Sequence, residues 1–483
     1  MYIGLDLGTS GLRALLTDAE GAPIGSATSD YNVSHPHAGW SEQNPSDWIT
    51  ALGACLAHLK ADHSGAFDAV RGISFSGHMH GAVVLNKDGE VLRPCILWND
   101  TRAHVEAAKL DQMAGVRDIS GNIVFPGFTA PKLAWMKANE PDLFDQVATV
   151  MLPKDYLSFW LTGRRVTDMS DAAGSAWLDV SNRRWSADLV AASDMNERQM
   201  PELLEGTDVV GQVLPDRAAT LGLNASVQVV AGGADNAVAA CGVGALGEGV
   251  AFVSLGTSGV LLSGRDRCAP SPQSAVHTFC HAVPSHWYQM GVNLAATDCL
   301  NWLSRISGQT PEALSDAAGD TLQAPTGVRF YPYLSGERTP HNDSQIRAGF
   351  TGLDVGTEIG DMSRAVMEGV SFALRDSYEA LKSTGLTLDG ALAIGGGTRS
   401  RIWTEILATT LNLPLHRPAQ GEFGAALGAA RLAICGVTGV TPESLMSRPP
   451  IADTIEPNQN LIAAFDDAYQ AFRAGYPKLK ALQ

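Results

Sequence analysis

Two short loops of the same composition open the two halves of this 483-residue chain. Gly8-Thr9-Ser10-Gly11 and Gly256-Thr257-Ser258-Gly259 each lie between two apolar runs, which predicts a strand, a tight turn and a second strand in both places. Turns of this kind expose backbone N–H groups and hydroxyls with little steric cover, which suits phosphate oxygens. The repeat therefore predicts two related domains that hold one nucleotide from both sides.

The two copies differ in chemistry at one position, two residues before the loop. The first copy has Asp6 there and the second has Ser254. A carboxylate in only one copy is expected if a single Mg²⁺ is bound to the phosphates, because Mg²⁺ prefers oxygen ligands. Asp6 is therefore the candidate metal residue.

A second acidic candidate follows a pair of glycines. Gly232 and Gly233 come after the apolar run Val227–Ala231 and are followed by Ala234-Asp235-Asn236. Asp235 lies about twenty residues before the second loop, near the junction of the halves, so we interpret it as a general base for a substrate hydroxyl. An N-cap of the next helix is the structural alternative for the same residue.

Two pairs of the twelve histidines are further candidates for ligand binding. Gly77-His78-Met79-His80-Gly81 follows the predicted strand Val70–Ser76, and a glycine-flanked turn at a strand end favours hydrogen bonding to a polar substrate. No third Cys or His cluster accompanies these two histidines, so metal binding is not favoured. His277 and His281 lack a partner motif and are interpreted as core or surface residues.

Two glycine-rich segments lead to different predictions. Gly395-Gly396-Gly397-Thr398-Arg399-Ser400 joins the strand Ala391–Ile394 to the helical stretch Arg401–Leu411, and it predicts a nucleoside site where a base or ribose lies against the backbone. Gly242–Gly247 matches G-x-G-x-x-G, but a helix precedes it, so we interpret it as a helix end. No Gly-Lys dipeptide occurs, which excludes a Walker A loop.

Composition limits the class of protein. Apolar residues make up 45% of the chain and charged residues 18%, and 34 basic against 51 acidic residues leave a formal net charge of −17. An acidic surface disfavours nucleic acid and gives no basic patch for a membrane. Seven cysteines without a Cys-x-x-Cys pair, no basic N-terminal region and no long apolar run lead us to expect reduced thiols, no signal peptide and a cytoplasmic location.

The elements that must position these residues alternate between strands and helices. In the first half, strands are expected at Tyr2–Leu7, Leu12–Thr17 and Pro23–Val33, a helix at Pro45–Lys60, and a hairpin formed by Val70–Ser76 and Val91–Trp98. The second half repeats the order, with a helix from Asp361, as its N-cap, toward Lys382. We expect an α/β fold with two domains, residues 1–245 and 246–483.

These residues, in this order, resemble the FGGY family of carbohydrate kinases. Besides the two loops, the resemblance rests on Gly127–Trp135, Ala348–Leu353, Asp361–Glu368, Trp40–Gln43, Trp98–Asp100, Met169–Gly174 and Ser335–Asn342. It covers the chain from Tyr2 to about Gly436. It implies two ribonuclease-H-like domains of the actin-like ATPase fold, with the active site in the cleft between them.

The resemblance also implies a role for each candidate. Asp235 would be the catalytic base and Asp6 a catalytic residue that holds Mg²⁺. Met79, His80 and Asn236 would contact the sugar. The nucleotide would be held by Thr9, Ser10, Gly11, Thr257, Gly396, Gly397 and Ser400.

Within the family, the phrases favour the kinases of D-xylulose, with ATP as the phosphate donor. Glycerol kinases carry an Arg-Glu pair where Met79-His80 stand here, which argues against glycerol. A ribulose or glycerol kinase remains the first alternative, and an actin-like or chaperone ATPase that phosphorylates no small molecule is the second. The expected partners are the ketose and ATP, without nucleic acid or membrane, and a homodimer is compatible with the sequence.

Overall fold

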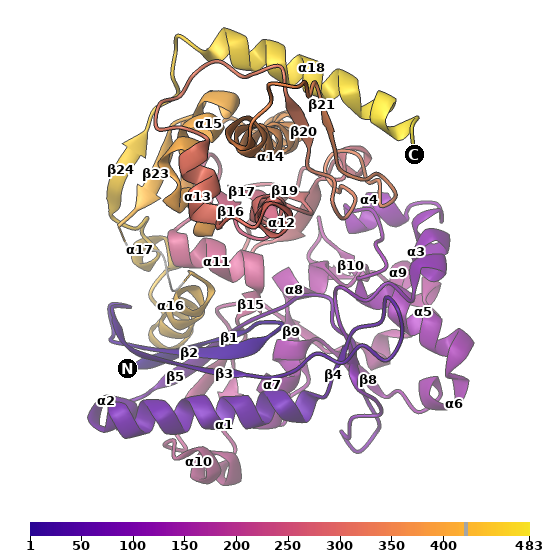
Figure 1. The fold of residues 1–483 in the computed structure, drawn as a ribbon. Coiled ribbons are helices and arrows are strands. Elements are labelled where there is room, and N and C mark those ends of the chain that lie inside the picture. The colour runs from indigo at the N-terminus through magenta and orange to yellow at the C-terminus, as the bar shows by residue number, and fades with distance from the viewer. Residues whose placement is uncertain (420–423) are drawn as a thin grey trace.

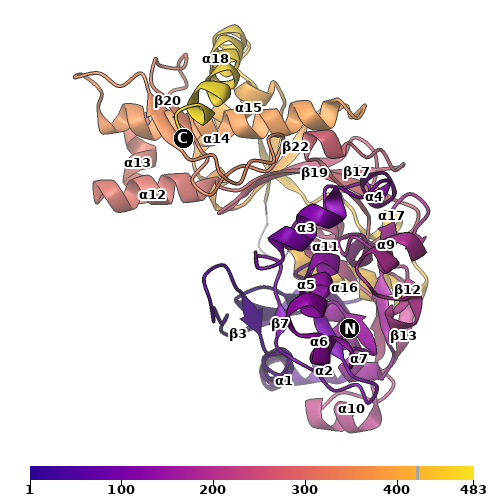
Figure 2. The ribbon, with the colours of Figure 1, turned by 90° about the vertical axis from the view of Figure 1, so that its right-hand side faces the viewer.

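The computed structural model describes residues 1–419 and 424–483, and these residues form two lobes (Figures 1 and 2). Each lobe contains a sheet of seven strands among the described residues. The first sheet contains β1 (Tyr2–Leu7), β2 (Gly11–Thr17), β3 (Pro23–Asp30), β5 (Gly72–Gly77), β13 (Val209–Gln212), β14 (Gln228–Val230) and β15 (Gly233–Ala234). The second contains β16 (Ala251–Leu255), β17 (Gly259–Arg265), β18 (His277–Cys280), β19 (Trp287–Asn293), β22 (Ala391–Ile394), β23 (Leu415–Pro418) and β24 (Ile451–Ile455).

The two sheets are built on the same plan. In each, an antiparallel hairpin carries the Gly-Thr-Ser-Gly loop at its turn, between β1 and β2 and between β16 and β17. A later strand then joins the first strand of the hairpin in parallel, β5 beside β1 and β22 beside β16. The predicted repeat is therefore confirmed as two strand–turn–strand units at equivalent places in two sheets.

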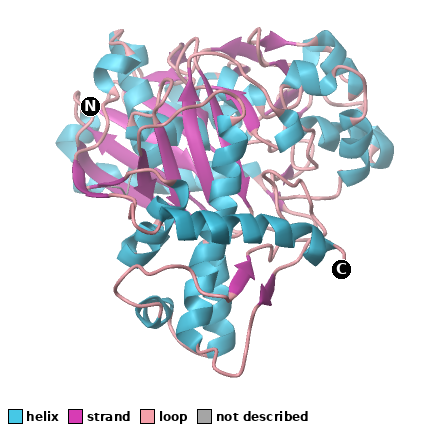
Figure 3. Ribbon diagram, turned by 90° about the horizontal axis from the view of Figure 1, so that it is seen from above, coloured by secondary structure: helices cyan, strands magenta, loops and turns pink. Residues whose placement is uncertain are grey.

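Helices cover the faces of both sheets and fill the space between them. In Figure 1, α1 (Pro45–Asp62) lies below the first sheet, and α11 (Asp235–Val243) and α16 (Gly424–Thr438) lie between the two sheets. Above the second sheet are α14 (Ile359–Lys382), α15 (Arg401–Leu411) and α18 (Ile462–Lys480). Seen from above, α18 crosses the second lobe and leads to the C-terminus (Figure 3).

Shorter elements connect these layers. The other helices are α2 (Ser64–Asp68), α3 (His104–Asp111), α4 (Val116–Ser120), α5 (Thr129–Asn139), α6 (Pro141–Phe144), α7 (Pro153–Thr162), α8 (Met169–Ala173), α9 (Ala187–Ala192), α10 (Pro215–Leu221), α12 (Thr297–Ser307), α13 (Pro311–Ala317) and α17 (Pro442–Leu445). The short strands are β4 (Glu42–Gln43), β6 (Val83–Leu85), β7 (Cys95–Ile96), β8 (Thr149–Met151), β9 (Val166–Asp168), β10 (Leu178–Asp179), β11 (Arg184–Trp185), β12 (Glu202–Leu204), β20 (Arg329–Tyr331) and β21 (Gly349–Thr351).

Two local predictions are corrected by the structure. The run Val70–Ser76 forms no hairpin with Val91–Trp98, because β5 is buried between β1 and β14 and pairs with both in parallel. Helix α14 begins at Ile359 after Glu358 as N-cap, so Asp361 is the third helical residue, and its carboxylate accepts the Glu358 N–H at 3.0 Å. Glu358 and Asp361 take part in one capping box. The sequence pattern therefore located the start of the helix but assigned the N-cap to Asp361 in place of Glu358.

Helix α16 belongs to the second half of the chain but packs against the first sheet. It contacts α11, β1 and β5, and one buried apolar cluster runs from Met79 and Val238 to Phe252, Tyr288 and Ala429. The two halves therefore share a continuous core. Within the described residues, no helix combines the length and the apolar character needed to cross a membrane, and all seven cysteines carry free thiols.

Candidate active site

The loop of the first sheet is held by hydrogen bonds on both sides. The Gly8 N–H donates to the Gly11 carbonyl at 3.0 Å and closes the turn. The Gln43 amide donates to the Thr9 carbonyl at 2.6 Å, and the Trp98 indole donates to the Thr9 hydroxyl at 3.0 Å. Ser10, at the tip, is exposed. Hydrogen bonds therefore fix the loop at Gly8 and Thr9, while Ser10 at its tip stays accessible to a ligand.

Asp6 lies near the end of β1, opposite Arg13 on β2 and beside Ser76 on β5. Burial raises the pKa of the Asp6 carboxyl, and the neighbouring Ser76 hydroxyl and Arg13 guanidinium act in the opposite direction. A half-buried carboxylate close to a candidate phosphate loop is an oxygen ligand of the type that a divalent cation requires.

Met79 and His80 form a turn directly after β5. His80 adopts a φ of 71°, which is rare for residues other than glycine, and its Nδ1 lies 2.6 Å from the Gly174 carbonyl oxygen. The backbone of the turn is held by Lys132, whose ammonium donates to the His80 carbonyl at 2.6 Å. Gly174 leaves the space that this arrangement needs, because a Cβ there would lie 2.6 Å from Met79 Cε.

Asp235 begins α11 directly after β15. The preceding residue, Ala234, is the N-cap, and the Asp235 carboxylate accepts the Asn236 backbone N–H at 2.7 Å and the Asn236 side-chain amide at 2.9 Å. Burial raises the pKa of Asp235 to about 6, the hydrogen bond from the Asn236 N–H lowers it, and the negative charge of Asp6 raises it further. Such a pKa suits a general base near neutral pH.

The strand register brings these residues to one edge of the first sheet. Ala234 on β15 pairs with Gly77 on β5, and Gly77 pairs with Leu7 on β1. All three strands are parallel, so the loop after β1, the turn after β5 and the start of α11 follow neighbouring strand ends. One edge of the sheet therefore carries Asp6, Thr9–Gly11, Met79–His80 and Asp235–Asn236, and ligands of open α/β sheets bind at such carboxyl ends of strands.

The second sheet carries the other group of candidates at the same end of its strands. Ser254 on β16 pairs with Ile394 on β22, so the turn with Thr257 lies beside Gly395. The Thr257 carbonyl accepts the Ala296 N–H at 2.8 Å, which attaches the loop to the start of α12, and the Thr257 side chain is exposed.

Gly395, Gly396 and Gly397 differ in how much space surrounds their Cβ positions. A Cβ on Gly395 would lie 2.6 Å from the Leu255 carbonyl oxygen, and a Cβ on Gly397 would lie 2.9 Å from Leu255 Cβ. Gly396 is exposed, and no described residue comes within 4 Å of the Cβ position. Ser400 caps α15 by accepting the Trp403 N–H at 3.3 Å. Of these residues, Gly396 offers the most open backbone to a ligand.

Close packing also explains why two glycines precede Ala234 and Asp235. A Cβ on Gly232 would lie 2.1 Å from the Phe75 carbonyl oxygen, and a Cβ on Gly233 would lie 2.8 Å from the Ser170 hydroxyl. These two glycines let β15 lie close to β5 and α8 and so bring Asp235 to the sheet edge.

Sequence reasoning did not identify the residues that approach the Met79–His80 turn from the second half. The Tyr288 hydroxyl donates to Met79 Sδ at 3.8 Å, and the rings of His80 and Phe279 lie 6.3 Å apart. Phe279 lies on β18 and Tyr288 on β19, and neither strand contains one of the motifs identified in the sequence. Their position near the turn follows from the packing of the two lobes and leaves no local sequence signal.

Lys132 and Trp98 were also missed as single residues, although both lie in phrases of the family. Lys132 is fully buried on α5, and burial lowers its pKa to about 7. Trp98 is 47% exposed although its indole N–H contacts the Thr9 hydroxyl. Neither this exposure nor the contact with Thr9, 89 residues away, can be read from the sequence.

Three buried carboxylates lie close enough together to suggest a metal site. Their oxygen atoms, from Asp155, Asp168 and Asp171, lie within 4.8 Å of one another. The Lys154 ammonium lies among them, 2.5 Å from Asp155, 2.8 Å from Asp168 and 3.9 Å from Asp171. The Lys154 ammonium therefore supplies the positive charge that these three carboxylates need. The three carboxylates do not bear on the expectation that His78–His80, His277 and His281 bind no metal.

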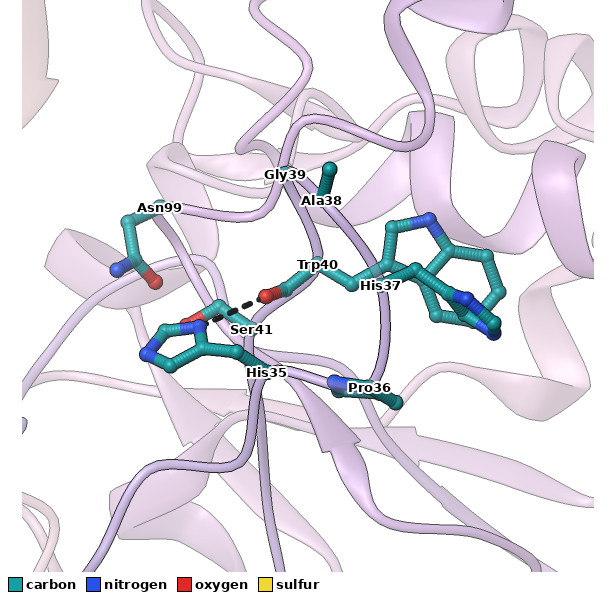
Figure 4. Close-up of a pocket in the computed structure, with 8 residues that line it drawn as sticks. All are labelled: His35, Pro36, His37, Ala38, Gly39, Trp40, Ser41 and Asn99. Atoms are coloured by element: carbon teal, nitrogen blue, oxygen red, sulfur yellow. Dashed lines mark hydrogen bonds between the residues drawn. The ribbon is translucent and has the colours of Figure 1, made fainter.

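A depression of about 560 Å³ lies between residues 35–41 and Asn99 (Figure 4). Its lining residues are His35, Pro36, His37, Ala38, Gly39, Trp40, Ser41 and Asn99. His35 Nδ1 lies 2.8 Å from the Trp40 carbonyl oxygen across the strand-like loop. None of the site residues predicted from the sequence lines this depression. Asn99 follows Trp98, whose indole N–H donates to the Thr9 hydroxyl.

Comparisons with known proteins show the family of the chain. The N-terminal domain of the FGGY family of carbohydrate kinases matches residues 1–242, and its C-terminal domain matches residues 251–437. The xylulose kinase of Escherichia coli strain K12 is 42% identical over 488 residues, covering 100% of both chains.

Solved structures give the same result. A xyloylose kinase from Brucella ovis is 52% identical with a TM-score of 0.98 and covers 100% of both chains. The xylulose kinase from Rhodospirillum rubrum is 29% identical with a TM-score of 0.92 and covers 99% of both. With its paired ribonuclease-H-like sheets and these matches along its length, the chain belongs to the FGGY family of carbohydrate kinases.

Proposed function

We propose that this chain transfers the γ-phosphate of ATP to the terminal hydroxyl of D-xylulose, giving D-xylulose 5-phosphate and ADP. One observation carries the proposal: Asp235 lies at the same sheet edge as the Gly8–Gly11 loop and the Met79–His80 turn. Burial raises the pKa of Asp235 to about 6. The names of the full-length relatives, xylulose kinases in both cases, support the choice of sugar.

The proposed chemistry is a direct transfer. The Asp235 carboxylate accepts the proton of the sugar hydroxyl, the hydroxyl oxygen forms a bond to the γ-phosphorus, and the bond from that phosphorus to the bridging oxygen breaks to release ADP. Positioning and charge stabilisation provide most of the catalysis in reactions of this type. Met79, His80 and Asn236 would contact the ketose and orient the hydroxyl toward the base.

The nucleotide would be held from both lobes. We assign Thr9, Ser10, Gly11 and Thr257 to the phosphates, and Gly396, Gly397 and Ser400 to the adenosine. We keep the division at residues 245 and 246 for the two domains, with the active site between them, because each proposed domain carries one loop. The exposed Thr257 side chain and the open backbone at Gly396 support this assignment.

We propose Asp6 as the residue that binds Mg²⁺. The donor set fits a hard cation, because Asp6 is a half-buried carboxylate close to a second carboxylate, Asp235, whose pKa it raises. The bound ion would neutralise charge on the phosphates. A cytoplasmic location is consistent with the seven free thiols.

A substrate panel tests the proposed function. ADP release is measured with ATP and D-xylulose, D-ribulose, glycerol or no sugar, and we expect the highest kcat/KM with D-xylulose. A higher value with D-ribulose or glycerol would identify another sugar kinase. Hydrolysis that no sugar accelerates would identify an ATPase instead.

The role of Asp235 is tested in the same assay by Asp235→Asn and by pH. The carboxylate must be ionised to accept a proton, so kcat/KM of the unaltered protein falls as the pH decreases through about 6. The asparagine variant keeps the shape without the base, and we expect its rate to fall roughly 10²–10⁴-fold while sugar binding is kept. Turnover near that of the unaltered protein would mean that Asp235 serves only the start of α11.

A further inference from the structure

We propose that Ser170, held by Asp168 and Lys154, is a positioning residue for the catalytic base. This inference rests on the proposed function, because it concerns the placement of Asp235. Ser170 contacts neither the sugar nor the nucleotide in this scheme, and it acts through the backbone of the residue before the base.

An ion pair followed by hydrogen bonds connects a buried lysine to the residue before the proposed base. The Lys154 ammonium lies 2.8 Å from one oxygen of Asp168, and the other oxygen of Asp168 accepts the Ser170 hydroxyl at 2.5 Å and the Ser170 N–H at 2.7 Å. The Ser170 oxygen accepts the Ala234 N–H at 3.0 Å. Ala234 is the N-cap of α11, and Asp235 follows it directly.

Each group in this series has a defined donor or acceptor role. Asp168 accepts the hydroxyl hydrogen, which turns the lone pairs of the Ser170 oxygen toward the Ala234 N–H. Lys154, Asp168 and Ser170 are all fully buried, so water does not compete for these bonds. A hydrogen bond to a charged partner in a buried site is stronger than an exposed neutral one, so the serine is held in a single orientation.

Glycines in the neighbouring strands leave room for Lys154 and Ser170. Lys154 packs against Gly77, where a Cβ would lie 2.7 Å from Lys154 Cβ, and Ser170 packs against Gly233, where a Cβ would lie 2.8 Å from the hydroxyl. Gly77 and Ala234 are register partners at the end of β5 and β15. Lys154, Asp168 and Ser170 therefore pack against the strand ends that lead to Asp235 and to the Met79–His80 turn.

The base needs such support because its own strand is short. Strand β15 contains two residues, Gly233 and Ala234, and pairs only with β5 within the described part of the first sheet. A misplacement of about 1 Å in a catalytic group can cost about 10²-fold in rate. The hydrogen bond at Ala234 fixes the point where the chain turns from β15 into α11, and with it the direction of the Asp235 carboxylate.

The first test compares Ser170→Ala with a matched control, Ser158→Ala on α7. Ser158 is also buried, and its hydroxyl has no hydrogen-bond partner among the described residues. We expect Ser170→Ala to lower kcat about 10- to 100-fold while the KM values for D-xylulose and ATP change less than about threefold. Ser158→Ala keeps kcat. Equal losses of kcat in the two variants, or a rise in the KM values alone, would overturn the proposal.

A double-mutant cycle with Asp235→Asn tests whether the effect passes through the base. If Ser170 acts by placing Asp235, the serine substitution has little further effect on kcat once the carboxylate is absent. A full, additive loss in the Asp235→Asn background would overturn the positioning role and leave the base in place. Turnover near that of the unaltered protein in Asp235→Asn alone would instead overturn the assignment of the base, and the positioning role with it.

Discussion

At the scale of single residues, the two loops differ in the side chain two residues before the turn. Asp6 and Ser254 occupy equivalent places, each near the end of the first strand of a hairpin and beside a parallel strand. Only Asp6 adds a carboxylate, and burial raises its pKa. Comparing the two positions therefore tests the proposal that Asp6, and not Ser254, binds the metal.

Asp6→Ala and Ser254→Ala are the matched substitutions for this difference. We expect Asp6→Ala to lower kcat by about 10²-fold or more, because a metal that stabilises phosphate charge contributes several kcal/mol. The Mg²⁺ concentration that gives half-maximal ADP release should also rise. Ser254→Ala should change both quantities much less. Equal losses in the two variants would contradict the assignment of the metal to one loop.

At the scale of elements, the contact between α11 and α16 depends on glycines. A Cβ on Gly428 of α16 would lie 1.9 Å from the Val238 carbonyl oxygen of α11, and a Cβ on Gly242 of α11 would lie 1.9 Å from the Gly424 carbonyl oxygen of α16. The two helices therefore touch through their backbones. Because α11 begins at Asp235, this crossing also sets the direction of the helix that carries the proposed base.

Gly428→Ala tests this crossing against Gly53→Ala, a helical glycine in α1. The Gly53 Cβ would make only an ordinary contact, 4.0 Å from Leu221 Cδ2. We expect Gly428→Ala to destabilise the protein by about 1–3 kcal/mol, as overpacking does. Gly53→Ala should stabilise it by about 0.5–1 kcal/mol. Thermal unfolding of both variants measures the difference, and an unchanged Tm in Gly428→Ala would mean that the helices separate freely.

At the scale of the whole molecule, the candidates are divided between two lobes. One set follows β1, β5 and β15 of the first sheet, and the other follows β16 and β22 of the second. Asn122 joins the lobes, because its amide donates to the Thr278 carbonyl at 2.8 Å and its oxygen accepts the Thr278 N–H at 2.9 Å. Under the proposed function, the nucleotide and the sugar would be held from both lobes, so the two sites would be complete only when the lobes approach each other.

Sugar binding should therefore favour a more closed form of the protein. We expect the radius of gyration from small-angle scattering to fall with D-xylulose, and also with 5-deoxy-D-xylulose, which lacks the reacting hydroxyl. The analogue should leave water as the only acceptor, so ADP release continues at a slow rate. A radius of gyration that changes with neither sugar would contradict closure and place both loops in one rigid site.

The sequence alone determined the elements whose signals are local. Both Gly-Thr-Ser-Gly hairpins, β22 and α15 follow the predicted positions, because turn residues, caps and apolar periodicity act within a few residues. The same local chemistry identified Asp235 as a candidate at a strand end. It also indicated the family, since the motifs are short, contiguous phrases.

The tertiary structure decided which distant segments lie together. It paired β5 with β1 and β14 in place of the expected hairpin, brought β18 and β19 against the Met79–His80 turn, and assembled Lys154, Asp168 and Ser170 behind Ala234. Strand pairing and buried hydrogen bonds join residues separated by tens to hundreds of positions. Such contacts depend on which surfaces are buried together in the folded chain, so no local pattern of residues predicts them.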